Sequence, residues 1–420
     1  MQNDKVLAQI LQWYRGKEQY LLVDGQAGSG KTYLVGVLLG ILNRYNIQVG
    51  VTAPTNEAVS QLALNLRKQG LCIPCSTIYK TLGFGFDTTK ETKILSQIRK
   101  VDLDDLQLLI VDEASMIPKI VHEAINTIGV KCLYLGHKNQ LPEIEDNSSA
   151  RSYIYTLNIP TINLTTQYRH TGSIFDYCIQ LNDIIDTNGY AYKLPRNFDI
   201  PMSTLLQGIK ENKGKLFLED IQKILCWTNN KVDDANNWFR HTVFGSGSTS
   251  RFLPSERILL RNSTTNLGKI KNRFDKTSFS IGELIPTNTK GRIVNVNYKV
   301  ILDILTYELE VDTELGKLYF YVPENTEEHL LLLKKYLKIA HGLKTPSKRE
   351  KAFANYHTIC SLFADVSYSY AITIHRAQGM TIPEVFLLLD NVNQCQNRLL
   401  RLKLHYVGAS RAQDKLNIIR

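Results

Sequence analysis

The sequence predicts an α/β protein built from two parallel-sheet domains with smaller inserted domains. Short apolar runs bounded by turn residues occur early in the chain and recur near its end, and the stretches between them suit helices. Between residues 281 and 365 the pattern changes to alternating, strand-like pieces and then to Lys-rich helical segments. The 420 residues, of which 43% are apolar, allow about three domains with a core in each.

The apolar runs indicate the strands of the two sheets and the domain boundaries. Runs of this kind are typical of strands that are buried on both faces of a parallel sheet. They are Tyr20–Asp24, Gln48–Thr52, Leu108–Val111 and Cys132–Leu135, and later Lys223–Trp227, Tyr370–Ile374, Val385–Leu389 and Leu416–Ile419. We expect a domain 1A at 1–71 plus 101–165 with an inserted hairpin domain 1B at 72–100. A domain 2A is expected at 166–280 plus 366–420, with an inserted small β domain 2B and its helical attachment at 281–365.

Charge and cysteine content narrow the class of protein. Fifty Lys and Arg residues against forty Asp and Glu give a formal net charge of +10, which suits nucleic acid, although a generic basic surface is the alternative. Seven scattered cysteines, with one isolated pair at Cys72 and Cys75, favour neither disulfides nor a metal site. No signal peptide opens the sequence, and no stretch approaches the roughly 18 apolar residues of a membrane-spanning helix. We expect a soluble, cytoplasmic protein with no membrane partner.

A phosphate-binding loop follows the first predicted strand. The segment from Gly25 to Thr32 matches the pattern G-x-x-x-x-G-K-[ST] between a strand and a helix. In such a loop the backbone N–H groups and the helix N-terminus bind phosphates. Lys31 is expected to bind the β- and γ-phosphates and Thr32 to ligate Mg²⁺, so the predicted cofactors are ATP and Mg²⁺. The remaining nucleotide-binding residues of the loop are Gly25, Ala27, Gly28, Ser29 and Gly30.

Two acidic residues end the apolar strand at Leu108–Val111. A carboxylate at this position can reach a metal ion in the phosphate loop, and Asp112 fits that role. Glu113 is then placed to accept the proton of the attacking water as general base, because one carboxylate cannot also serve the metal. Taken without the phosphate loop, Asp112 and Glu113 would be interpreted as solvated acids at the end of a strand. The phosphate loop earlier in the chain favours the catalytic interpretation instead.

Two classes of protein fit this chemistry: a nucleic-acid motor, and a P-loop NTPase or kinase that acts on a small molecule. A motor needs a second lobe that contributes arginines across a cleft and a line of nucleic-acid contacts over both lobes. A kinase needs only a lid. The remainder of the chain carries further motifs, which favour the motor.

Those motifs occur in a fixed order. They are Ala53-Pro54-Thr55, Ser76-Thr77-Ile78-Tyr79-Lys80-Thr81-Leu82, Gly136-His137-Lys138-Asn139-Gln140-Leu141-Pro142, Leu164-Thr165-Thr166-Gln167-Tyr168-Arg169, Ala371–Thr381 and Tyr406–Ala412. The set resembles superfamily 1B helicases of the RecD-like branch, from Gln2 to the end of the chain. The resemblance implies two RecA-like domains, an SH3-like insertion as domain 2B, and an ATP-dependent 5′-to-3′ DNA helicase of replication, repair or recombination. It implies a bacterial or phage-infected cell as the setting.

The resemblance also implies roles at the nucleotide. Gln2 would contact the adenine edge, and Gln140 would sense the γ-phosphate and couple it to DNA. Arg169 and Arg411 would neutralise charge on the transferred phosphoryl group. Gly379 would approach the nucleotide through its backbone. Taken alone, each arginine is more typical of a surface or ion-pair residue.

Contacts with single-stranded DNA follow from the same motifs. Hydroxyl groups on loops can donate to phosphate without reading sequence, which suits a motor that must pass every base. The residues concerned are Pro54, Thr55, Thr77, Tyr79, Thr373 and His375. The expected partners are single-stranded DNA and single-strand/duplex junctions, with single-strand-binding or replication proteins as protein partners, and we expect the chain to act as a monomer.

Two residues depart from the family pattern. His137 stands where an Asp usually follows the glycine of the third motif, and His cannot replace a carboxylate as an acceptor with fixed negative charge. We therefore expect coupling through this loop to differ from the family. Tyr79 stands where His is common, but a Tyr can still stack on a base or donate to phosphate.

The segment Gly83–Lys100 is too long for a tight turn, and related helicases insert a strand-separating hairpin at this place. An apolar tip can shield a newly exposed base face from water. Ile94 and Leu95 are the candidate wedge residues. The alternative is that both side chains pack the hairpin onto its own lobe.

Overall fold

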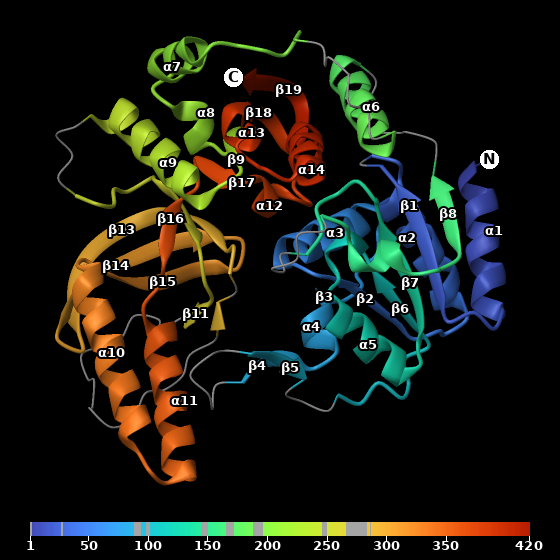
Figure 1. The fold of residues 1–420 in the computed structure, drawn as a ribbon, viewed down its shortest axis with the longest axis horizontal. Coiled ribbons are helices and arrows are strands. Elements are labelled where there is room, and N and C mark those ends of the chain that lie inside the picture. The colour runs from blue at the N-terminus through green and yellow to red at the C-terminus, as the bar shows by residue number, and fades with distance from the viewer. Residues whose placement is uncertain are drawn as a thin grey trace.

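The protein has two α/β lobes and an antiparallel β domain that carries a helical hairpin (Figure 1). It is described from a computed structural model. The structure describes residues 2–26, 28–87, 94–97, 101–143, 150–164, 172–187, 196–245, 250–265, 284–285 and 287–420. Among these residues, no helix has the length and apolar character needed to cross a membrane.

Lobe 1 is built on a six-stranded parallel sheet in the order β3-β2-β6-β7-β1-β8. Its strands are β1 (Tyr20–Gly25), β2 (Val49–Ala53), β3 (Cys75–Thr77), β6 (Leu108–Val111), β7 (Lys131–Gly136) and β8 (Thr161–Leu164). One apolar cluster joins the sheet to α1 (Gln2–Arg15), α2 (Lys31–Arg44) and α3 (Asn56–Lys68). A second joins it to α4 (Ile78–Thr81), η1 (Ala114–Met116), α5 (Lys119–Ile128) and η2 (Tyr153–Thr156). Both faces of this sheet are therefore covered, as the apolar runs predicted.

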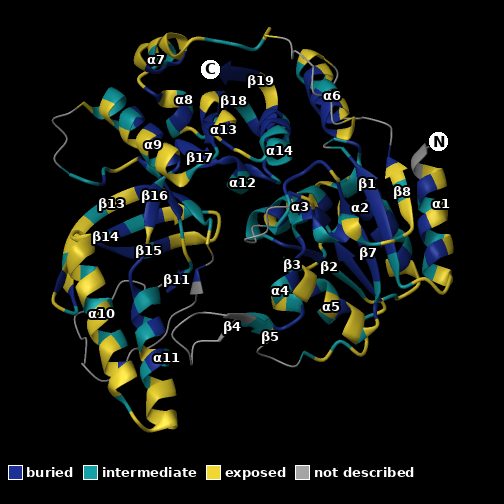
Figure 2. Cartoon of the chain, in the orientation of Figure 1, coloured by how far each residue is buried: buried dark blue, intermediate teal, exposed yellow. Residues whose placement is uncertain are grey.

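Lobe 2 is built on a four-stranded parallel sheet in the order β17-β9-β18-β19. Its strands are β9 (Gln222–Cys226), β17 (Ala371–Thr373), β18 (Ile382–Leu388) and β19 (Ala412–Ile419). Its helices are α6 (Ser173–Asp186), α7 (Met202–Glu211), α8 (Lys215–Leu218), α9 (Asn229–Phe244), α12 (Ile374–Ala377), α13 (Leu389–Asn393) and α14 (Arg398–Ala409). The sheet is buried between two layers, with α6 and α14 in one apolar cluster and α7 and α9 in another (Figure 2).

The third region is a five-stranded antiparallel sheet in the order β15-β14-β13-β10-β16. Its strands are β10 (Arg257–Leu260), β13 (Lys290–Ile301), β14 (Ile304–Thr313), β15 (Gly316–Pro323) and β16 (Val366–Tyr368). Helices α10 (Thr326–Gly342) and α11 (Pro346–Leu362) pack together and project beyond the sheet, with much of α10 exposed (Figure 2). A short pair, β11 (Thr264–Thr265) and β12 (Leu284–Ile285), lies beside α11.

A hairpin of β4 (Phe84–Asp87) and β5 (Ile94–Gln97) projects from lobe 1 (Figure 1). The predicted bounds of both inserted domains are wrong in detail. β3 lies within the expected hairpin insertion but pairs with β2 in the lobe 1 sheet, and its sequence Cys-Ser-Thr carries no apolar signal. β10 and β16 lie outside 281–365 but pair with each other, and β10 also pairs with β13, because the insertion sheet recruits strands from both flanking segments.

Candidate nucleotide and nucleic-acid site

A cavity of about 380 Å³ lies between lobe 1 and lobe 2. This volume is in the range of small-molecule sites. It is lined by residues of the phosphate loop, by both acids after β6, and by residues of lobe 2. The structure brings these predicted residues together around it: Gly28, Gly30, Lys31, Thr32, Asp112, Glu113, Gln140, Gly379 and Arg411.

The phosphate loop connects β1 to α2 and depends on its glycines. Gly28 and Gly30 both have φ of 86°, in the left-handed region that glycine adopts without strain. A Cβ on Gly25 would lie 2.4 Å from Oγ of Ser29. That Oγ is buried and has no hydrogen-bond partner among the residues described, so a phosphate oxygen would satisfy it. Ala27 lies outside the described residues.

Lys31 points back into its own loop. Its Nζ donates to the carbonyl oxygen of Gly25 and, at 3.0 Å, to that of Gln26. Burial lowers the pKa of Lys31, and the negative charges of Asp112 and Glu113 oppose this effect. A nucleotide phosphate would give the ammonium group a charged acceptor in place of two neutral carbonyls.

The two acids after β6 have different environments. Asp112 accepts a hydrogen bond of 2.9 Å from the backbone N–H of Glu113, and burial together with the charge of Glu113 raises the pKa of Asp112 to about 6. Glu113 has φ of 52°, a strained conformation for a non-glycine residue. A divalent cation between Asp112 and Thr32 would offset the concentrated negative charge, so the donor set fits Mg²⁺.

Lobe 2 contributes an arginine and a glycine to the cavity. The guanidinium of Arg411 is 5% exposed and donates to the carbonyls of Met380 and Val407, both at 3.2 Å, and to Oγ of Ser410 at 2.9 Å. Gly379 has φ of 84°, and a Cβ at this position would lie 3.7 Å from the Cα of Ala58 of lobe 1. Both residues therefore sit on the face of lobe 2 that meets lobe 1.

Gln378 is a site residue that the sequence analysis did not single out. Its Nε2 donates to Oε2 of Glu113 at 3.3 Å and to Oγ of Ser115 at 3.4 Å, across the cleft. The sequence did contain a signal for Gln378, because this residue directly precedes Gly379 in the Ala371–Thr381 motif. Only the fold, however, places it on the predicted general base.

The loop after β7 contacts both the cavity and lobe 2. Gln140 lines the cavity, and its buried Oε1 has no hydrogen-bond partner within the part of the chain described. The next residue, Leu141, is fully buried in the core cluster of lobe 2. His137 in the same loop bonds Asn182 of α6, and its Nδ1 lies 3.5 Å from Oδ1 of Asp24. The carboxylate of Asp24, near the end of β1, therefore lies beside His137.

Three predicted DNA-contacting threonines share one structural position. Thr77 and Thr373 are the last residues of parallel strands, and Thr55 lies two residues after the end of β2. Each is the N-cap of the following helix, where its hydroxyl oxygen accepts a hydrogen bond of 3.1 to 3.3 Å from the backbone N–H three residues later. Thr77 is also paired in register with Ala53, so the ends of β2 and β3 are neighbours. Each hydroxyl oxygen accepts from its own helix, so its O–H can still donate to another group. Thr55 and Thr77 are partly exposed, whereas Thr373 is 7% exposed.

The other predicted DNA-contacting residues, Pro54, Tyr79 and His375, differ from one another in burial and in their contacts. Pro54 is buried, and Tyr79 is half-buried with its ring in edge contact with Phe84, 6.4 Å between centroids. Burial lowers the pKa of His375 to about 4, so its ring is neutral at neutral pH.

Several predicted residues cannot be placed. Arg169 lies outside the described residues. Gln2 begins α1, but its side chain lies outside the description. Ile94 and Leu95 lie in β5, where their backbones pair with Asp87 and Phe86, and their side chains are likewise not described.

Comparison with known proteins agrees with this geometry. The AAA domain family matches residues 6–181, and the UvrD-like helicase C-terminal domain family matches residues 368–419. The ATP-dependent DNA helicase dda of Enterobacteria phage T4 is 23% identical over 434 residues, covering 96% of this chain and 95% of that protein. RecD of the RecBCD enzyme from Buchnera aphidicola is 23% identical over 439 residues, covering 95% and 70%. The chain is similar to superfamily 1B helicases.

The fold agrees as well. Bacteroides Pif1 helicase in complex with ADP-AlF3 and ssDNA superposes with a TM-score of 0.52 at 15% identity, covering 98% of this chain and 91% of that chain. The predicted α/β fold with two RecA-like domains is therefore confirmed, and so is the predicted resemblance to superfamily 1B helicases.

Proposed function

We propose that this chain is an ATP-dependent DNA helicase that moves 5′ to 3′ along single-stranded DNA and unwinds duplex. The observation that carries the proposal is the cavity between the lobes. It combines a phosphate loop and two acids of lobe 1 with Arg411 of lobe 2. A small-molecule kinase would need no such contribution from a second RecA-like lobe, and the similarity to Dda, RecD and Pif1 helicases does not favour one.

ATP hydrolysis follows from the lobe 1 residues. Lys31 would exchange its loop carbonyls for the β- and γ-phosphates, and Ser29 would donate its free hydroxyl. Thr32 and Asp112 would hold Mg²⁺, which when bound offsets the negative charge of the phosphates. Glu113 would accept the proton of the attacking water, and Gln378 would keep the carboxylate of Glu113 aimed at it.

Lobe 2 completes the site when the cleft closes. Arg411 and Gln140 line the same cavity, so they would approach the transferred phosphoryl group together, and Arg169 would add a second positive charge. The guanidinium of Arg411 donates hydrogen bonds to two backbone carbonyls. To bind the phosphoryl group, it would replace these neutral acceptors with charged phosphate oxygens. This exchange favours closure with ATP and reopening after hydrolysis. Gln2 would contact the adenine, and Gly379 would let the backbone approach the nucleotide.

DNA would be held by both lobes. Thr55 and Thr77 on lobe 1 and Thr373 on lobe 2 would donate their O–H groups from helix N-caps that follow parallel strands. Such contacts with phosphate carry no sequence preference, and binding should weaken as salt rises. Alternation of the tighter grip between lobes, as the cleft opens and closes, would move a single chain along the strand as a monomer. Tyr79 and His375 would contact bases or backbone beside these threonines.

Strand separation is assigned to the β4–β5 hairpin as domain 1B. It extends from lobe 1 toward the side of the molecule where α11 lies (Figure 1), and its strands pair only with each other among the elements described. Ile94 and Leu95 lie at the end of β5 nearer the hairpin tip, where an apolar wedge would meet a single-strand/duplex junction.

The experiment that tests the proposal is an ATPase assay with and without single-stranded DNA. We expect DNA to raise kcat strongly and the stimulation to fall with added salt. A rate that ignores DNA but rises with a small phosphoryl acceptor would instead favour a kinase.

A further inference from the structure

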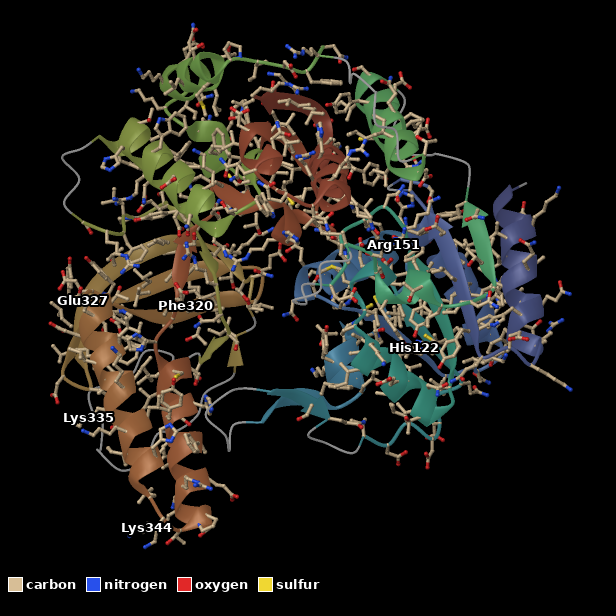
Figure 3. The ribbon with its side chains drawn as sticks, viewed as in Figure 1. His122, Arg151, Phe320, Glu327, Lys335 and Lys344 are labelled. Atoms are coloured by element: carbon tan, nitrogen blue, oxygen red, sulfur yellow. The ribbon has the colours of Figure 1, made fainter. Side chains whose placement is uncertain are left out.

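The helical hairpin of α10 and α11 carries an uneven distribution of charge along its length. Its base begins with Glu327 and Glu328 in the first turn of α10. The segment 334–351 around its far end contains seven basic residues and one acidic residue, Glu350. We call the seven the basic tip; they are Lys334, Lys335, Lys338, Lys344, Lys348, Arg349 and Lys351. Figure 3 shows Glu327 near the sheet, Lys335 part-way along α10 and Lys344 at the far end of the hairpin.

The basic tip is exposed and lacks counter-charges. All seven residues are exposed, and none of their side chains forms a salt bridge or a hydrogen bond within the described structure. Seven basic residues against one acidic residue give the segment 334–351 a formal charge of +6, which is more than half of the +10 of the whole chain. Like charges gathered on one projection create a local positive potential that attracts polyanions.

The fold of the hairpin does not explain this charge. Lys334 and Lys338 are four residues apart on α10, where like charges repel each other. Lys348 and Arg349 lie in the first turn of α11, near the positive end of the helix dipole, where cations are unfavourable. The hairpin is stabilised instead by an apolar cluster that joins both helices to β13, β14 and β15. The basic tip therefore indicates an anionic partner outside the chain.

The spacing of the tip fits a nucleic-acid backbone. From Lys335 to the end of α10 at Gly342 the helix rises by about 10 Å, at 1.5 Å per residue. Successive phosphates of one strand of B-form DNA follow each other at about 3.4 Å along the duplex axis. The basic side of α10, continued by Lys344 in the next loop, therefore spans about three phosphates of one strand.

The side chains of the tip favour double-stranded over single-stranded DNA. Surfaces that bind single strands combine positive charge with aromatic rings on which the bases stack. The segment 334–351, which is described throughout, exposes no Phe, Tyr or Trp: its one tyrosine, Tyr336, is half-buried. A duplex keeps its bases stacked inside and offers phosphates to its partner, which the exposed lysines can contact without reading sequence.

The place of the hairpin in the fold suits a duplex that is being opened. The β4–β5 hairpin of lobe 1 extends toward the side of the molecule where α11 lies (Figure 1). A duplex opened at the β4–β5 hairpin would have its double-stranded part on that side. None of the residues of the basic tip lines the cavity between the lobes, so the tip is separate from the nucleotide site.

We propose that the basic tip of α10 and α11 binds the phosphate backbone of duplex DNA ahead of the point of strand separation. It keeps the duplex aligned with the β4–β5 hairpin while the two lobes move along the single strand. This inference deepens the proposed function and rests on it for the place of the tip in unwinding. The affinity of the tip for duplex, in contrast, can be measured without ATP.

The test measures how the full chain binds a DNA hairpin that has a blunt duplex end and no single-stranded tail. Binding is followed by fluorescence anisotropy at several salt concentrations, without ATP. The variant is Lys335→Ala, Lys338→Ala and Lys344→Ala combined. We expect the slope of log K against log salt to fall in magnitude by about 3, because each lost phosphate contact removes about 0.9. Alanine favours helix, and Lys344 lies in the loop after α10, so the hairpin should stay folded.

Two further variants serve as controls. Replacing the same three lysines by Arg keeps the charge, and this variant should retain the slope of the unsubstituted chain. Lys17→Ala, Lys210→Ala and Lys215→Ala combined remove the same amount of charge from exposed sites on the two lobes, and this variant should also retain it. An equal slope in the tip variant and the lobe variant would overturn the proposal. An equal loss of affinity for duplex and for a single-stranded oligonucleotide would overturn the assignment to duplex.

An anionic membrane surface is the competing partner, because Leu331 and Ile339 are exposed on α10 beside the lysines. Sedimentation with vesicles of phosphatidylserine and phosphatidylcholine separates the two partners. We expect no binding that depends on the tip. Vesicle binding that is lost in the tip variant, together with unchanged duplex binding, would contradict the proposal.

The consequence for unwinding is measured on duplexes with a 5′ single-stranded tail. The tip variant should unwind more slowly than the lobe variant, while its ATPase activity with single-stranded DNA should match. Equal unwinding by the two variants would remove the tip from the path of the duplex. A chain that neither hydrolyses ATP nor unwinds would overturn the proposed function, and the salt slope of duplex binding would still decide whether the basic tip binds duplex.

Discussion

Replacing Gln378 by Ala tests the link between lobe 2 and the general base. The substitution removes the hydrogen bond of 3.3 Å from Nε2 of Gln378 to Oε2 of Glu113. A hydrogen bond to a charged group contributes about 1.5 to 3 kcal/mol, and the length of this one places it at the lower end. A loss of about 1.5 kcal/mol in the transition state corresponds to roughly a tenfold fall in kcat. The KM for ATP should change little, because Gln378 does not line the nucleotide cavity.

The assay is single-turnover ATP hydrolysis in the presence of saturating single-stranded DNA. Gln207→Ala is the control, since Gln207 is exposed on α7 and bonds only Glu211 in the described structure, far from the cleft in sequence and fold. Equal rates for Gln378→Ala and Gln207→Ala would refute the idea that Gln378 positions Glu113. A raised KM with an unchanged kcat would assign Gln378 to nucleotide binding instead.

Three further predictions concern the named site residues. Lys31→Ala and Glu113→Gln should each abolish turnover, but Glu113→Gln should still bind ATP in a filter or fluorescence assay, and near-parent hydrolysis by it would remove Glu113 as the base. Arg411→Ala should slow hydrolysis on the order of 10³-fold with less effect on DNA binding, and a normal rate would remove Arg411 from the site. Replacing Ile94 and Leu95 together by Ala should reduce duplex unwinding while DNA-stimulated ATPase persists. A parallel loss of both activities, or of neither, would show that these residues are not the wedge.

Local patterns in the sequence were sufficient to identify most of the lobe 1 residues that line the cavity. The phosphate loop and the Asp112 and Glu113 pair are contiguous segments whose strand context is readable from apolar runs, so the predicted residues lie around one cavity. The predicted domain boundary was wrong where a strand lacks an apolar run. β3 is polar, and only pairing with β2 makes it a strand.

Contacts between distant segments could not be predicted. Gln378 reaches Glu113 from 265 positions away, and Asp24 meets His137 only because β1 and β7 are neighbours in the sheet. The sequence analysis expected His137 to leave its motif without a carboxylate, whereas the fold brings one from another strand. A contact between two strands cannot be found from a pattern that is examined one motif at a time.

The central claim is tested most directly by unwinding of matched duplexes that carry either a 5′ or a 3′ single-stranded tail. The duplexes should share one sequence, and ATP and Mg²⁺ should be supplied in excess, with Glu113→Gln as the inactive control. We predict ATP-dependent unwinding from the 5′ tail and little from the 3′ tail. Efficient unwinding from the 3′ tail alone would contradict the 5′-to-3′ assignment, and unwinding from neither would contradict the helicase.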